Sequence, residues 1–141
     1  MKDLVAYLNF DGNTREAMTF YSACLGAKVE MHTFGENMPG GMPPGMEAAK
    51  DWIMHARLTK GSAAILMASD GMPGMALHVG NNFSVSVHCE SAEEVDRLFA
   101  AFSEGGTARM PVTDASWGAR FGMLTDKFGI QWMFNYEYPK S

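Results

Sequence analysis

The chain has 141 residues, of which 47% are hydrophobic and 19% are charged, and its formal net charge is −5. This length suffices for one domain or for two small modules that share a core, and the composition excludes wholesale disorder. The 11 Lys and Arg residues against 16 Asp and Glu residues argue against a nucleic-acid-binding protein, because phosphate binding needs clustered cations. Methionine is unusually frequent, with 13 copies.

The first half of the chain is predicted to fold as a strand, a helix and three further strands. Asn13 or Thr14 is expected to cap the helix, and Gly26 to end it. A loop at about 35–50, rich in Gly, Pro and Met, separates the second strand from a hairpin that turns at 60–62. The four predicted strands are residues 4–10, 27–34, 52–60 and 63–69.

The same order of elements returns after a second Met-rich loop at 70–82. Residues 83–89 alternate as a strand, and Ser91 with Glu94 forms a capping box for a helix that ends at Gly105-Gly106. Further strands are predicted at about 107–112, 117–124 and 130–136. The two halves match weakly by residue identity and better by element order.

This pattern predicts an α+β protein of paired βαβββ modules, whose mixed sheets enclose a pocket. The prediction is one domain over 1–141, with module one at about 1–78 and module two at about 79–141. One helix covers one sheet face in each module, so the other face stays open until a second module or a second chain closes against it. The sequence leaves open whether modules pair within one chain or across a dimer.

We expect neither a secretory signal nor a membrane-spanning segment in this sequence. The N-terminus lacks a charged region followed by a long apolar stretch, and no apolar run approaches the ~20 residues that a membrane-spanning helix needs. Cys24 and Cys89 are far apart and outside any CxxC motif, which favours thiols in a reducing compartment. We therefore expect a cytoplasmic protein that binds neither nucleic acid nor membrane.

Four segments carry a resemblance to a known family: YLNFDGNTREAMTFYSACLGA at 7–27, MHARL at 54–58, LMASD at 66–70 and WGARFGMLTDKFGIQWMFN at 117–135. Together they resemble the PhnB-like subgroup of the vicinal oxygen chelate superfamily, which includes glyoxalase I, bleomycin resistance proteins and extradiol dioxygenases. The resemblance implies the paired βαβββ fold and a homodimer. It does not select one activity, because this fold hosts lyases, isomerases, dioxygenases and plain binding proteins.

Metal-dependent members of that superfamily place ligands on the first and fourth strands of each module. The resemblance puts these positions at Ala6, near Leu66, at Asn82 or Phe83, and at Met133. None of them is a usual metal ligand, so we expect no metal at this site and no cofactor. The histidines offer no evident alternative, because no two of them have the short spacing of a helix or hairpin metal site. They are His32, His55, His78 and His88.

Strand alternation assigns side chains to the two faces of each sheet. The pocket-facing set is mostly apolar with a few polar groups, which is the usual composition of a small-molecule site. The candidate pocket residues are Leu8, Leu66, Asp70, Ser84, Ser86, His88, Trp117, Gln131 and Met133. Asp70 has an alternative role in capping the loop after its strand. Phe83, Val85 and Val87 are expected to pack on the helix of module two.

Two residues are candidates for catalysis. His55 shares a strand face with Arg57, and it could act as a general base or anion anchor; the alternative is a structural hydrogen bond. Arg120 could neutralise negative charge that develops on a ligand; the alternative is that Asp114 or Asp126 holds it.

The sequence therefore favours a protein that binds a small, largely apolar molecule, or a metal-independent enzyme whose substrate is unknown. One alternative is a metal-dependent lyase or dioxygenase with a non-standard metal site. A further alternative is a resistance protein that sequesters a drug. The methionines of the two loops are expected to form an adaptable lid or a dimer contact, with solvated loop residues as the alternative.

Overall fold

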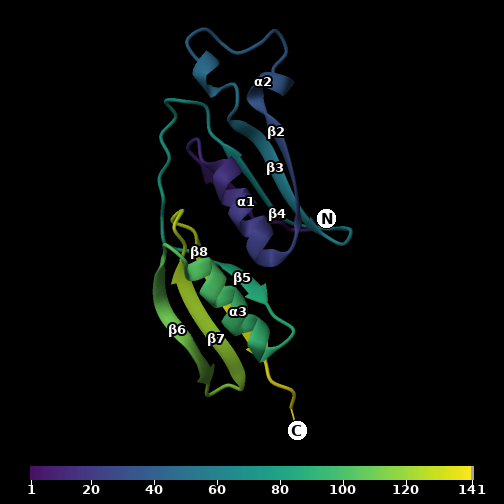
Figure 1. The fold of residues 1–141 in the computed structure, drawn as a ribbon, viewed down its shortest axis with the longest axis vertical. Coiled ribbons are helices and arrows are strands. Elements are labelled where there is room, and N and C mark those ends of the chain that lie inside the picture. The colour runs from purple at the N-terminus through teal and green to yellow at the C-terminus, as the bar shows by residue number, and fades with distance from the viewer. Residues whose placement is uncertain (141) are drawn as a thin grey trace. The chain divides into compact units, whose positions relative to one another are not determined.

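A computed structural model describes residues 1–140 of the chain, which divide into two compact units, Met1–His78 and a second unit from Val79 onward. Each unit contains a four-stranded sheet and a helix of 12 residues, in the chain order βαβββ (Figure 1). The predicted α+β class and the repeated order of elements are therefore confirmed. No helix in the described part of the chain is long and apolar enough to cross a membrane.

The sheet of the first unit has the strand order β1-β4-β3-β2, with β1 parallel to β4 and the other pairs antiparallel. Helix α1 packs across one face of this sheet through Ala17, Met18 and Tyr21, all fully buried (Figure 1). Gly26, with φ of 63°, ends the helix as the sequence predicts. The elements are β1 (Tyr7–Phe10), α1 (Thr14–Leu25), β2 (Lys28–Thr33), α2 (Phe34–Asn37), the 3₁₀ helix η1 (Glu47–Ala49), β3 (Ile53–Lys60) and β4 (Ala63–Asp70).

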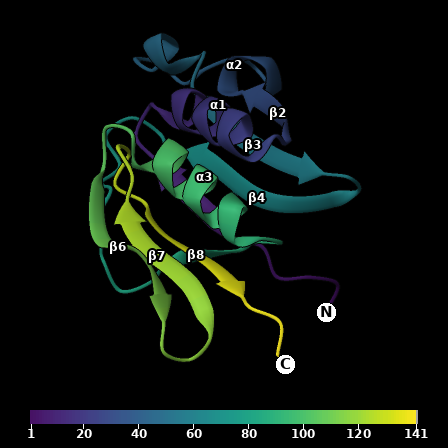
Figure 2. The ribbon, with the colours of Figure 1, turned by 60° about the horizontal axis from the view of Figure 1, so that its bottom comes forward.

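The sheet of the second unit repeats this topology in the order β5-β8-β7-β6, with β5 parallel to β8. Figure 2 shows α3 lying along one face of it. Val95, Leu98 and Phe102 of α3 are buried, and the Phe102 ring lies 4.7 Å from Trp132 and 5.1 Å from Phe134 between centroids. The elements are β5 (Val85–His88), α3 (Ala92–Ser103), β6 (Thr107–Ala115), β7 (Ala119–Thr125) and β8 (Gln131–Glu137).

Three local predictions are wrong in detail. The first strand begins at Tyr7 rather than at residue 4, although the Ala6 carbonyl already accepts a hydrogen bond from Met67 N at 3.1 Å. The Met-rich segment after β2 contains α2 and η1; the Thr33 side chain caps α2 by accepting from Glu36 N. Phe83 lies before β5 and is 66% exposed, so it does not pack on the helix.

The faces predicted for β1 and β4 are also wrong. Leu8 on β1 and Leu66 on β4 are 3% and 2% exposed, and they lie on the sheet face that α1 covers. The opposite face of these strands carries Tyr7 and Met67, which are register partners. Both sets of positions on β4 are largely apolar, so alternation alone did not tell which set lies under the helix.

Candidate functional site

The sheet of the first unit carries a row of mixed side chains on the face turned away from α1, called here the open face. The register pairs Tyr7 with Met67, Met67 with Arg57, and Arg57 with Glu30, so the row crosses all four strands. Side chains of register partners lie on the same face. The row therefore combines an aromatic ring, a thioether and an ion pair, a composition typical of a small-molecule site.

His55 on β3 contacts Tyr7 of this row. The Tyr7 hydroxyl lies 3.0 Å from His55 Nδ1, and the two ring centroids are 5.7 Å apart. The hydroxyl donates to Nδ1 when the ring proton is on Nε2, and it accepts when the proton is on Nδ1. The structural hydrogen bond that we considered for His55 is thus present, and the Nε2 atom is left for a ligand. The catalytic role of His55 stays a prediction.

Arg57 is the cation of the open face. Its Nη2 donates to Glu30 Oε2 at 2.8 Å, and both side chains are about two-fifths exposed. This hydrogen bond and the charge of Arg57 hold the pKa of Glu30 below its ordinary value. An ion pair so exposed contributes little to stability. Most N–H groups of the guanidinium are not used by Glu30, and they could meet a polar group of a ligand.

His32 and His55 are register partners in the antiparallel ladder of β2 and β3. No two histidines have the short sequence spacing of a helix or hairpin metal site, and the register nevertheless brings this pair opposite each other. The segment from α2 to η1 separates the two strands, so sequence spacing gave no sign of the pair.

The predicted pocket residues of the second unit lie in or beside its sheet. Ser86 and Met133 are register partners, on the face opposite the buried Trp132 and Phe134. Further members of the predicted set are His88, whose Nε2 lies 3.4 Å from Ser86 Oγ, and Ser84, which precedes β5. Whether these residues bind a ligand stays a prediction.

Gln131 and Trp117 differ in accessibility. Gln131 is 7% exposed and its Nε2 donates to the Phe83 carbonyl at 2.8 Å, so this amide holds the segment that precedes β5. Trp117 lies in the turn before β7, is 68% exposed, and meets the Phe121 ring edge-on at 5.9 Å between centroids. Of the two, Trp117 is the side chain that a ligand could reach.

Asp70 lines a cleft, but its carboxylate is taken up by hydrogen bonds within the fold. Its Oδ1 accepts from Gly12 N at 2.9 Å, from Thr14 N at 3.1 Å and from Thr14 Oγ1 at 2.7 Å, and its Oδ2 accepts from Ile53 N at 2.8 Å. Asp70 caps α1 from the end of β4, whereas the Asn13 side chain makes no capping bond. The predicted alternative, a capping role, is the better description, although the capped segment is the helix.

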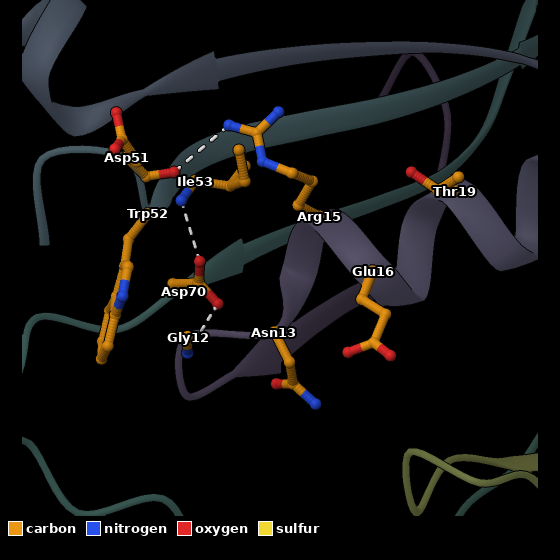
Figure 3. A pocket seen from close by; sticks show the side chains of 9 residues that line it. All are labelled: Gly12, Asn13, Arg15, Glu16, Thr19, Asp51, Trp52, Ile53 and Asp70. Atoms are coloured by element: carbon orange, nitrogen blue, oxygen red, sulfur yellow. Dashed lines mark hydrogen bonds between the residues drawn. The ribbon is translucent and has the colours of Figure 1, made fainter.

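A cleft of about 520 Å³ lies beside this carboxylate, at the start of α1 (Figure 3). The Trp52 ring packs over Gly12, where an added Cβ would meet it at 2.8 Å. Arg15 donates to the Asp51 carbonyl across the rim at 3.2 Å. Both oxygens of Asp70, the buried carboxylate that lines the cleft, already accept hydrogen bonds from the fold.

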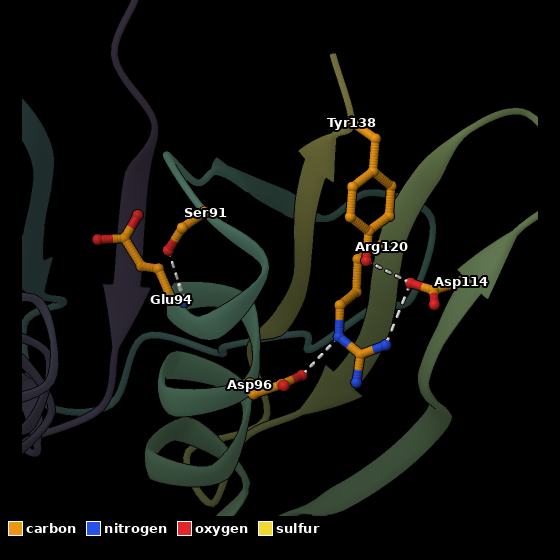
Figure 4. A network of polar contacts seen from close by, with 6 residues as sticks. All are labelled: Ser91, Glu94, Asp96, Asp114, Arg120 and Tyr138. Carbon is orange, nitrogen blue, oxygen red and sulfur yellow. Dashed lines mark hydrogen bonds and ion pairs between the residues drawn. The ribbon is translucent and has the colours of Figure 1, made fainter. Parts of the chain in front are cut away.

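Arg120 lies on the α3 side of the second sheet and is held by two carboxylates (Figure 4). Its Nε donates to Asp96 Oδ1 at 2.8 Å and its Nη1 to Asp114 Oδ1 at 3.1 Å, while Tyr138 Oη donates to the same Asp114 oxygen at 2.7 Å. These bonds raise the pKa of Arg120 and of Tyr138 and lower that of Asp114. Of the partners that we considered, Asp114 is present and Asp126 is not.

This network points to a structural role for Arg120. Asp96 lies on α3 and Asp114 on β6, so the guanidinium on β7 links three elements of the unit. The carboxylates already neutralise its charge, and it lies on the opposite sheet face from Met133. The catalytic role of Arg120 stays a prediction that these contacts do not support.

Comparisons with known proteins identify the family. A family model described as 3-demethylubiquinone-9 3-methyltransferase matches residues 2–134. Protein YjdN of Escherichia coli strain K12 is 33% identical over 140 residues, covering 94% of this chain and 93% of the relative. The chain belongs to this PhnB-like family. The PhnB-like assignment expected from the sequence is thereby confirmed.

Two solved structures of similar proteins support the same assignment. The crystal structure of protein PA1353 from Pseudomonas aeruginosa is 41% identical, with a TM-score of 0.82 and coverage of 97% of this chain and 98% of that one. A Bacillus cereus protein described as a putative 3-demethylubiquinone-9 3-methyltransferase, PhnB protein, is 26% identical, with a TM-score of 0.75 and coverage of 96% and 99%. Both of these proteins share the fold of this chain over nearly their whole length.

The metal-binding positions of the superfamily do not fit an ion in this PhnB-like chain. Leu66 lies under α1, and the neighbouring positions on the open face are held by Tyr7 and Met67. In the second unit, Met133 supplies a thioether and Asn82 precedes β5. Across residues 1–140, no group of three or more His, Cys, Asp or Glu side chains is placed to hold a metal ion.

Cys89, at the end of β5, should react slowly with iodoacetamide at pH 8. Burial, with a further contribution from the charge of Glu94, raises the pKa of its thiol to about 11. The thiolate is the nucleophile, and at pH 8 it is then on the order of a thousandth of the population. We expect the alkylation rate, followed by peptide mass spectrometry, to rise about tenfold per pH unit up to pH 11. A native rate at pH 8 equal to that in urea would contradict this.

Proposed function

We propose that the chain binds a small, largely apolar organic molecule on the open face of the first unit, without a metal at the superfamily positions. The observation that carries the proposal is the contact of Tyr7 with His55, at 3.0 Å, beside the thioether of Met67 and the guanidinium of Arg57. An apolar surface with a few directed polar groups is what small-molecule sites share.

The Tyr7–His55 contact is the polar anchor of this proposed site. In the tautomer in which His55 Nδ1–H donates to the Tyr7 hydroxyl, Nε2 is left to accept a hydrogen bond or a proton from the bound molecule. If the chain is an enzyme, His55 is the group that acts as base. Neither a substrate nor a reaction is part of the proposal, because the side chains on the open face do not select one.

The proposal also covers the oligomeric state of the protein and the compartment in which it acts. A sheet covered by one helix leaves its other face to be closed by a second module or a second chain. We propose a homodimer that acts in the cytoplasm. Light scattering behind a sizing column tests the dimer: a mass of one chain at micromolar concentration would contradict it.

Methionine methyl groups offer a direct test of the binding site. With [ε-¹³C]methionine, a screen of small organic metabolites should contain compounds that shift the Met67 resonance and leave that of Met18, which is buried under α1, in place. Because a hydrogen bond contributes about 0.5–1.5 kcal/mol, His55→Gln should weaken such a compound about two- to tenfold.

The matched control is His78→Gln, in a loop outside the sheet, which should leave the affinity unchanged. Shifts spread equally over Met67 and Met18, or an affinity that His55→Gln leaves intact, would contradict the proposed site.

A further inference from the structure

His32 and His55 lie opposite each other on neighbouring strands. They are direct partners in the antiparallel register of β2 and β3, so their side chains lie on one sheet face. Residues directly opposite each other have Cβ atoms about 4.5–5.5 Å apart. Two imidazoles at that separation can reach one ion at the usual metal–nitrogen distance of about 2.0–2.1 Å.

The Tyr7 hydroxyl orients one of these imidazoles for metal binding. It lies 3.0 Å from His55 Nδ1 and can accept the Nδ1 proton, and in that tautomer Nε2 carries the lone pair that binds an ion. Metal-binding histidines commonly hold their other ring nitrogen by such a hydrogen bond, which fixes the ring and its tautomer. His32 is exposed on the edge strand β2, so its ring can turn toward the same ion.

The charges around the pair come from both strands. Glu30 and Lys28 precede His32 on the same face of β2, and Arg57 follows His55 on β3. Arg57 and Glu30 form an ion pair with each other, and Lys28 adds a further positive charge on the same face. The local charge therefore does not attract cations strongly, and any metal affinity has to come from the imidazoles.

We propose that His32 and His55 together bind one divalent transition-metal ion, Cu²⁺ more tightly than Ni²⁺ or Zn²⁺. Imidazole suits these ions, and the order follows their general preference for nitrogen ligands. The two rings are the only protein ligands in the proposal, since no group of three or more candidate ligands gathers in the described residues; water fills the remaining positions. The pair lies on β2 and β3, away from the superfamily positions on the first and fourth strands.

This inference goes beyond the proposed function and does not depend on it. The proposed ligand site and the proposed metal site share one atom, His55 Nε2. A bound ion would occupy the nitrogen that is proposed to act as base. Occupancy by a metal would then weaken binding of an organic ligand. Binding of the metal alone can be measured whether or not such a ligand is found.

The test is calorimetric titration of the full chain with CuSO₄ and NiCl₂, together with electron paramagnetic resonance of the copper complex. We expect one Cu²⁺ per chain and nitrogen hyperfine coupling from two imidazoles. His32→Gln and His55→Gln should each weaken Cu²⁺ binding about tenfold or more and leave coupling from one imidazole. Tyr7→Phe keeps both histidines but removes the hydrogen bond that orients His55. It should weaken Cu²⁺ binding about tenfold, which is the lower end of the effect of removing a hydrogen bond to a metal ligand.

His78→Gln and His88→Gln serve as controls, because neither residue lies in the first-unit sheet. They should leave both the affinity and the coupling unchanged. The inference is overturned if His32→Gln binds Cu²⁺ as the unmodified chain does, or if His88→Gln abolishes the signal. Since His32 is exposed on an edge strand, its substitution should leave the thermal midpoint unchanged, which separates lost ligation from lost folding.

Discussion

Replacing Asp70 with alanine should lower the free energy of unfolding by about 3 kcal/mol or more. The carboxylate is 4% exposed and accepts four hydrogen bonds, three of them from backbone N–H groups. Alanine leaves the buried donors of Thr14 and Ile53 without this acceptor, and each unsatisfied buried donor costs about 1–3 kcal/mol. The loss also removes the anion at the N-terminus of α1, where negative charge is stabilising.

Urea denaturation followed by circular dichroism measures this effect. Asp70→Asn keeps one carbonyl oxygen in place, so it should fall between alanine and the unmodified chain. Asp11→Ala is the matched control, because Asp11 is exposed in the turn that Asp70 holds. A loss below about 1 kcal/mol for Asp70→Ala would mean that water replaces the carboxylate and that Asp70 does not anchor the helix.

Local signals in the sequence predict the elements of this fold well. Gly26 and the Ser91–Glu94 pair mark a helix end and a helix start, and both are as predicted: Gly26 is left-handed and Ser91 Oγ accepts from Glu94 N. Such signals work because the partners are a few residues apart, so the chain forms them independently of the rest of the fold.

The candidate site depends on partners that are distant in the sequence. Tyr7 meets His55 across β4, and Asp70 reaches the first turn of α1 from the end of β4. No local pattern encodes these contacts, because they follow from strand order and register. The sequence also predicts the wrong face for Leu8, which is expected to face a pocket and instead packs under α1.

The contacts of Arg120 could be predicted from the sequence only in part. Asp114 was among the partners considered, and the antiparallel ladder of β6 and β7 makes it a register partner of Arg120. Asp96 was not considered, because its position depends on how α3 packs on β7. The sequence therefore indicated that a carboxylate would hold Arg120, and only the packing showed that two do.

Asp126 anchors the second unit, and its loss should be nearly as costly as that of Asp70. The carboxylate is 4% exposed; Oδ1 accepts from Phe128 N at 2.8 Å and Ile130 N at 3.0 Å, and Oδ2 accepts from Trp132 Nε1 at 2.8 Å. Asp126→Ala leaves the indole N–H without this acceptor in the core. We expect a loss of about 2–4 kcal/mol in the free energy of unfolding, with Glu137→Ala, an exposed carboxylate on β8, as the unaffected control.

A double-mutant cycle separates the indole contact from the turn. Trp132→Phe removes the indole donor and keeps an aromatic ring near Phe102, whereas Asp126→Ala removes the acceptor. If the buried hydrogen bond stabilises the fold, the double variant should lose less free energy of unfolding than the two single variants lose in sum. The expected difference is about 1–3 kcal/mol. Strict additivity would assign the stabilising role of Asp126 to the backbone amides of the turn alone, and Trp132 would then act in the core only by its volume.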